Sequence, residues 1–173
     1  MTGTSIRKLA FGAMALAGLA ASAAMAADNL VPDPDFKKVQ FEPPTYESSW
    51  VPYQINSPYE AKLDAAAGKI TLTGGKTFLH SSKFAVSAGK AYAIGLQAEG
   101  KGKVSVECLW WTADGGMTEP HRTIPVEPVE LKGEPKALEG KATAPTNAAT
   151  LYIRAVVEDG TITLAKPVVT AAP

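Results

Sequence analysis

Residues 103–116, KVSVECLWWTADGG, constrain the fold of this chain more than any other stretch. Apolar side chains recur there at every second position, which is the pattern of a β-strand whose successive side chains point to opposite faces of a sheet. Asp114-Gly115-Gly116 then ends the strand, because these residues readily adopt the positive φ angles of a tight turn. The face predicted to line the core carries Val104, Val106, Cys108 and Trp110.

The second face of this strand changes character along its length. Ser105 and Glu107 are polar, as a solvated face requires, but Leu109 and Trp111 are large and apolar. A strand that is apolar on both faces near one end is either sandwiched there or presents a binding surface. For Trp111 the sequence leaves two interpretations open, a platform for a ligand and packing beneath a long loop.

The rest of the chain predicts an all-β fold. Short alternating segments recur about every eight to twelve residues and are separated by Gly, Pro or Asn, which favours a β-sandwich or barrel. Residues 91–99 and 150–157 alternate most clearly, and no segment after residue 27 has a helical period. We expect the chain to reverse at Gly100-Lys101-Gly102, so that residues 91–99 and 103–111 form a hairpin, and to turn again at Asp159-Gly160.

The first 26 residues have the parts of a bacterial signal peptide. Arg7 and Lys8 precede an apolar, Ala-rich run at residues 9–19, and Ala24-Met25-Ala26 fits the small-x-small cleavage site. The apolar run is too short to span a membrane. We therefore expect residues 1–26 to be removed and residues 27–173 to form one domain in the periplasm or outside the cell.

The charge of the exported chain excludes several classes of partner. Without Arg7 and Lys8, the 17 basic side chains become 15 against 17 acidic ones, a net charge of −2. Such a chain has no basic excess to neutralise nucleic-acid phosphates. It also has no polybasic cluster for an anionic lipid surface.

No motif nominates a catalytic or metal site. The sequence has no Gly-x-Ser-x-Gly elbow, no paired-histidine helix, no phosphate loop and no Cys-His cluster. His80 precedes Ser81 and Ser82, but we interpret it as a histidine at a strand end. The single cysteine, Cys108, lies on the predicted core face and behaves there as a small buried hydrophobe. We expect a protein that is not an enzyme.

Three blocks of the sequence match one family of modules. They are NLVPDPDF at residues 29–36, FAVSAGKAY at residues 84–92, and APTNAATLYIR at residues 144–154. These blocks resemble the opening segment, a strand-turn-strand unit and the entry to the penultimate strand of galactose-binding-like jelly-roll domains. The likeness is strongest to carbohydrate-binding modules of the family 4 and family 9 type. It covers nearly all of residues 27–173 and implies an antiparallel jelly-roll β-sandwich that binds carbohydrate.

The same resemblance implies a place for a calcium ion. In such modules, carboxylates after the opening Phe and in the last strand help to hold a structural calcium. Here Lys37 and Lys38 follow Phe36, and Ala165-Lys166-Pro167 stands where an Asp pair is common. Because Ca²⁺ needs several hard oxygen ligands, we disfavour a structural calcium and expect no cofactor.

The face opposite the predicted core gathers residues that suit a sugar. Sugars present C–H faces that stack on aromatic rings and hydroxyls that need fixed polar partners. We expect a concave β face with a floor at Ala93 and Gly95. Its predicted ligand-binding residues are Trp111, Tyr152, Arg154, Glu107 and Gln97. Trp50 and Tyr53, in a Pro-rich segment, either complete the site at its rim or pack beneath a loop.

The sequence thus predicts a secreted, non-catalytic protein that binds a polysaccharide or oligosaccharide by stacking and hydrogen bonds. The alternative is a structural or protein-interaction β-sandwich of the cell envelope that has no sugar site and docks on another envelope or secreted protein. Neither interpretation involves nucleic acid or a membrane span.

Overall fold

The computed structural model describes residues 29–39, 50–54 and 59–172, and of residues 53, 54 and 59 it describes the backbone alone. The predicted signal peptide, residues 1–26, lies outside the described residues. In the described ranges no helix is long and apolar enough to cross a membrane.

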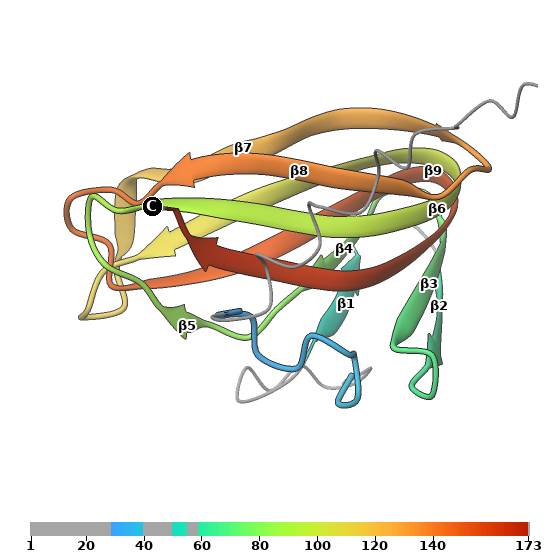
Figure 1. Ribbon diagram of the computed structural model, residues 1–173, viewed down its shortest axis with the longest axis horizontal. Helices are drawn as coiled ribbons and strands as arrows, with labels where there is room; N and C mark the ends of the chain where they lie inside the picture. Colours follow the sequence, from blue (N-terminus) through green and yellow to red (C-terminus); the bar gives the residue numbers. More distant parts are fainter. Residues whose placement is uncertain (1–28, 40–49, 55–58, 173) are drawn as a thin grey trace, which may run out of the picture.

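The described residues form nine strands, and the predicted all-β class is confirmed (Figure 1). The strands are β1 (Val51–Gln54), β2 (Tyr59–Asp64), β3 (Lys69–Gly74), β4 (Thr77–His80), β5 (Phe84–Ala85), β6 (Ala91–Trp111), β7 (Met117–Lys132), β8 (Lys136–Thr143) and β9 (Thr150–Ala171). Every pairing between these strands is antiparallel.

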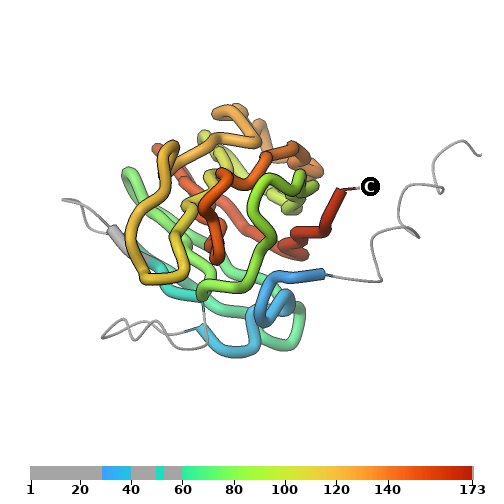
Figure 2. The backbone as a smooth tube through the Cα atoms, turned by 90° about the vertical axis from the view of Figure 1, so that its left-hand side faces the viewer, coloured from blue at the N-terminus to red at the C-terminus, as the bar shows by residue number. Residues whose placement is uncertain are grey.

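Two long strands, β6 and β9, run through both layers of the sandwich. In layer A the order is β1-β4-β9-β6-β7, built on the second half of β6 and the first half of β9. In layer B the order is β2-β3-β9-β6-β8, built on the opposite halves of the same two strands. Figure 2 shows the resulting chain path, which wraps around an interior.

The predicted hairpin at Gly100-Lys101-Gly102 is wrong, because β6 bends there and continues. Gly100 and Gly102 have φ angles of 131° and 133°, and the β6–β9 register shifts between Lys101 and Lys103. A local bulge of this kind re-aims a strand without reversing it. Asp159-Gly160, predicted as a turn, is the matching bend inside β9, where Gly160 lies directly against Lys101.

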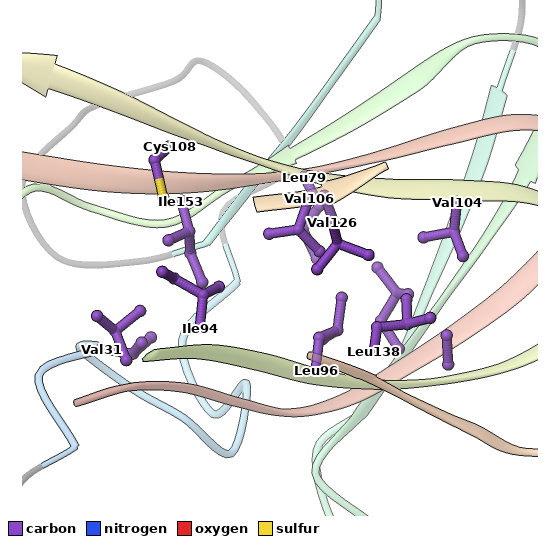
Figure 3. Packing of buried hydrophobic residues seen from close by; sticks show 14 of the residues in the cluster. Val31, Leu79, Ile94, Leu96, Val104, Val106, Cys108, Val126, Leu138 and Ile153 are labelled. Carbon is purple, nitrogen blue, oxygen red and sulfur yellow. The ribbon is translucent and has the colours of Figure 1, made fainter. Parts of the chain in front are cut away.

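The predicted core faces of the long strands are confirmed. The alternating residues of β6 and β9 predicted to face inward are all buried: Tyr92, Ile94, Leu96, Ala98, Val104, Val106, Cys108, Trp110, Leu151, Ile153, Ala155 and Val157. In Figure 3, Leu96 of layer B points toward Val106 and Val126 of layer A, and Ile94 of layer B points toward Ile153 of layer A. Each large aliphatic side chain buried in this way contributes about 1.5–3 kcal/mol to the free energy of unfolding.

The opening segment, residues 29–39, closes one end of this core. Asn29 accepts a hydrogen bond from the Val169 amide through Oδ1 and donates one to the Pro167 carbonyl through Nδ2. Val31 and Phe36 are buried in the core. The segment therefore belongs to the sandwich and holds the end of β9.

Candidate functional site

The outer face of layer A brings together most of the predicted binding residues. Across the β6–β9 ladder, Glu107 lies opposite Arg154, and Leu109 lies opposite Tyr152. Paired residues of an antiparallel ladder share a face, and so do residues two apart along a strand, so Trp111 joins the same face. Alternation along each strand and the β6–β9 register together place these residues on one face.

One end of this face is closed by an ion pair over an aromatic ring. Arg154 donates from Nε (2.7 Å) and Nη2 to one oxygen of Glu107, Oε2. The guanidinium carbon also lies 4.6 Å from the centre of the Phe78 ring, in cation–π contact. Glu107 is only 7% exposed, so its charge is compensated mainly by protein groups.

The other end of the face presents a cluster of aromatic rings. The rings of Trp111 and Tyr152 lie 6.1 Å apart with planes inclined by 32°. His121 of β7 meets Trp111 edge to face at 5.0 Å, and His80 of β4 lies 5.3 Å from Tyr152. We call Trp111, Tyr152, His80 and His121 the aromatic cluster. Its four members come from four neighbouring strands and are all half-buried.

Lys83 covers one side of the Trp111 ring. Its Nζ lies 3.7 Å from the ring centre, a close cation–π contact. The short connection between β4 and β5 is held in place just before this lysine, since Ser81 bonds Ile153 of β9 through both its amide and its hydroxyl. The anchored connection places the exposed ammonium group of Lys83 above the Trp111 ring.

The nitrogens of the aromatic cluster differ in their environments. The Nε1–H of Trp111 is buried and has no hydrogen-bond partner among the described residues. His121 Nδ1 lies 2.8 Å from the Trp110 carbonyl oxygen, and because a carbonyl can only accept, this nitrogen carries the proton. Burial, helped by the charge of Arg154, lowers the pKa of His80 from 6.5 to about 4. His80 is therefore neutral at neutral pH.

Gln97 does not lie on the outer face of layer A. Because β6 continues through its bend, residues 91–99 belong to layer B, and Gln97 is exposed on the outer face of that layer. With Gly95, Ala137 and Lys166 it lines a hollow of about 630 Å³. The structure therefore separates Gln97 from the aromatic cluster, and Ala93 and Gly95 are not the floor beneath it.

Trp50 and Tyr53, the second predicted cluster, do not form a ligand surface among the residues that the structure describes. Trp50 is 1% exposed, packs edge to face on Phe36 at 4.9 Å, and donates from Nε1 to the Asp33 carbonyl. The Trp50 ring is therefore part of the core, which agrees with the interpretation that Trp50 packs inside the protein and does not bind a ligand. The side chain of Tyr53 lies outside the described residues.

Besides His80 and His121, three contributors to this face were not predicted as binding residues. Lys83 stands in a short connection, and Phe78 stands in a strand of four residues. Arg122 lies on β7, where three prolines obscure the alternation, and its Nη1 is 3.6 Å from Glu107 Oε1. The β6–β7 register, which the sequence does not reveal, places Arg122 opposite Leu109.

The environment of Cys108 matches the interpretation of a buried hydrophobe. Its side chain is fully buried, and burial raises the pKa of its thiol to about 12. No group of three His, Cys, Asp or Glu side chains suited to a metal ion occurs within the described ranges, and the expectation about calcium stays a prediction.

Comparison with known proteins shows the fold. No protein-family model matches the chain, and no curated protein does either. Among solved structures, a family 4 carbohydrate-binding module matches with a TM-score of 0.54 at 15% identity, over 72% of this chain and 87% of that one. The family 61 module TmCBM61, solved with β-1,4-galactotriose, matches with a TM-score of 0.53 at 14% identity, over 84% of this chain and 100% of that one.

A third match is part of a longer enzyme. The CBM22-1–GH10 modules of Clostridium thermocellum xylanase 10B, solved with xylohexaose, match with a TM-score of 0.55 at 10% identity. The likeness covers 86% of this chain but only 28% of the xylanase chain. This chain therefore has the jelly-roll β-sandwich fold of these carbohydrate-binding modules.

Proposed function

We propose that this protein is an exported, non-catalytic carbohydrate-binding protein whose site is the open end of the outer face of layer A. The observation that carries the proposal is the pairing of Trp111 with Tyr152 beside Lys83 and Arg122. Structural likeness to three carbohydrate-binding modules supports the proposal at the level of the fold. The signal-peptide pattern of residues 1–26 supports export.

The aromatic cluster suits the shape of a sugar ring. Two rings inclined by only 32° offer adjoining apolar surfaces to the C–H faces of successive sugar residues. Met117, in register with Trp111 across the β6–β7 ladder and 66% exposed, extends the apolar surface. Both aromatic side chains are already held by their neighbours, which reduces the entropy lost on binding.

Lys83 has to move when a sugar stacks on the side of Trp111 that it covers. An exposed cation–π contact is worth only about 0.5–1 kcal/mol, so the displacement costs little. The released ammonium can then donate hydrogen bonds to the ligand. A ligand oxygen could reach the Nε1–H of Trp111, which has no hydrogen-bond partner in the part of the chain that the structure describes, and would then remove a further penalty of about 1–3 kcal/mol.

A non-catalytic role agrees with the chemistry of the aromatic cluster. A general base at neutral pH needs a pKa near 7, whereas His80 has a pKa of about 4. Glu107 is committed to Arg154 and largely buried. These groups hold the face together and leave recognition to the aromatic and cationic side chains.

The test is a binding screen of residues 27–173 against soluble and insoluble polysaccharides. Trp111→Ala and Tyr152→Ala should each weaken binding about tenfold or more, because each removes a stacking surface. Trp111→Phe should retain part of the affinity. Lys141→Ala, an exposed change on β8 in layer B, is the control and should bind like the wild type.

Two outcomes would count against the proposal. Binding that survives both alanine substitutions would place the sugar elsewhere. A correctly folded protein that binds no glycan would favour the alternative of a protein-interaction sandwich.

A further inference from the structure

Positive charge exceeds negative charge at the proposed site. Lys83, Arg122 and Arg154 contribute three cations, and Glu107 is the carboxylate that contacts the two arginines. Arg154 donates two hydrogen bonds, from Nε and Nη2, to one oxygen of that carboxylate. Arg154 is therefore the main ion-pair partner of Glu107. Arg122 remains 3.6 Å from the other oxygen, with 53% of its side chain exposed.

Two accessible cations border this face on opposite sides of β6: Lys83 lies over the Trp111 ring, and Arg122 lies beside Glu107. Lys83 immediately precedes β5, which pairs with β9 on one side, and Arg122 lies on β7 along the other edge. The nearby Asp114 is directed into its own turn, where its carboxylate accepts hydrogen bonds from the Thr112 hydroxyl and the Gly116 amide. Because the exported chain is net negative, this positive charge is a local property of the site.

We propose that the ligand is an acidic polysaccharide, bound through uronic acid carboxylates that pair with Lys83 at the aromatic cluster and with Arg122 beside Glu107. This inference rests on the proposed function of the same site. When a sugar ring lies flat on Trp111, its carboxylate projects from the ring edge, toward the side chains that border the aromatic surface. A guanidinium group can bind a carboxylate through two parallel hydrogen bonds, and an ammonium group adds a mobile point charge.

A neutral sugar would use this site less well. It would displace water from Lys83 and Arg122 and return hydrogen bonds to neutral hydroxyl oxygens, without the second charge of an ammonium–carboxylate or guanidinium–carboxylate pair. A uronate would give Lys83 a charged partner and would give Arg122 a second one besides Glu107. The attraction would also depend on salt, since exposed charges are screened over about 8–10 Å at physiological ionic strength.

The experiment compares each acidic polymer with its own carboxyl-reduced form. Polygalacturonate, alginate and glucuronoxylan are titrated at low and moderate salt, with dextran sulfate as a general polyanion. The proteins are the wild type, Lys83→Gln, Arg122→Gln, Trp111→Ala and Lys141→Gln. The last variant removes the same charge from the outer face of layer B and is the matched control.

We expect at least one acidic polymer to bind about tenfold tighter than its reduced form, and the preference to fall with added salt. Lys83→Gln and Arg122→Gln should each reduce the preference to about twofold, because each change lowers affinity for the acidic polymer more than affinity for its reduced form. Lys141→Gln should keep the preference, and Trp111→Ala should weaken both forms.

Several results would overturn the inference. Equal affinity for acidic and reduced polymers, lost in Trp111→Ala, would refute the uronate and leave the proposed function standing. If Lys141→Gln lost the preference for the acidic polymer as much as Lys83→Gln does, general attraction between charges would explain the binding. The same would hold if dextran sulfate bound Trp111→Ala as tightly as the wild type. No binding of any polymer by the folded protein would contradict the proposed function as well.

Discussion

Glu107 sets the character of the outer face of layer A. Glu107 is 7% exposed, and its carboxylate accepts two hydrogen bonds from Arg154. This pairing orients the guanidinium over Phe78 and closes that end of the face. A buried carboxylate without such a partner would be strongly destabilising, so the pair fixes which side chains of the face remain available to a ligand.

A prediction at the residue scale concerns His80 and acid. Because the pKa of His80 is about 4 in the folded protein and 6.5 as an ordinary value, the unfolded chain binds the proton more readily between these two pH values. The contribution of His80 to stability is complete above pH 6.5 and is lost as the pH falls toward 4. The loss is on the order of 3 kcal/mol.

Urea unfolding from pH 7.5 to 4 measures this effect. His80→Gln cannot take up the proton and should flatten the fall in the free energy of unfolding. Lys141→Gln, an exposed change on β8 in layer B, is the control and should leave the pH dependence in place. An unchanged pH profile in His80→Gln would contradict the argument.

At the element scale, the bends of β6 and β9 make two layers out of two long strands. Gly100 has φ of 131°, and a Cβ atom there would overlap the carbonyl oxygen of Thr161. Gly133, in the β7–β8 connection, has φ of 115° but nothing within 4 Å of an added Cβ atom. Comparing an alanine substitution at Gly133 with one at Gly100 therefore distinguishes the cost of φ strain from the cost of crowding between strands.

Gly133→Ala should lower the free energy of unfolding by about 1–2 kcal/mol, through φ strain alone. Gly100→Ala should cost at least about 2 kcal/mol more, because β6 and β9 must also move apart. Chemical denaturation of both variants measures the difference. Equal losses would show that the close approach at the bend is unimportant, whereas a Gly100→Ala chain that cannot fold while Gly133→Ala does would agree with the prediction.

The same bends explain which parts of the structure the sequence could predict. Alternation identified the inward faces of residues 91–98, 104–110 and 151–157, because a buried face excludes polar side chains wherever the strand leads. It could not show whether Gly100-Lys101-Gly102 reverses or bends the chain, since glycine permits both. Gln97 was misplaced for this reason. Lys83 and Arg122 reach the face through register and a short connection, and neither leaves a periodic signal.

At the scale of the whole molecule, β6 and β9 should make the two layers one cooperative unit. Each strand contributes one half to layer A and the other half to layer B, so neither layer can be released while the other keeps both strands intact. The core residues also interdigitate across the layers, as Leu96 and Val106 do. A layer that lost its packing would therefore destabilise the other through shared backbone and shared core.

Leu138→Ala tests this coupling from layer B. Leu138 of β8 is 2% exposed, and its truncation should cost about 2–4 kcal/mol. Native-state hydrogen exchange at Ile94 in layer B and Val106 in layer A should show the same decrease in opening free energy, because both amides open only when the whole sandwich does. Lys141→Ala, exposed on the same strand, should change neither amide by more than about 0.5 kcal/mol. A decrease at Ile94 without one at Val106 would mean that the layers open separately, despite the two strands that join them.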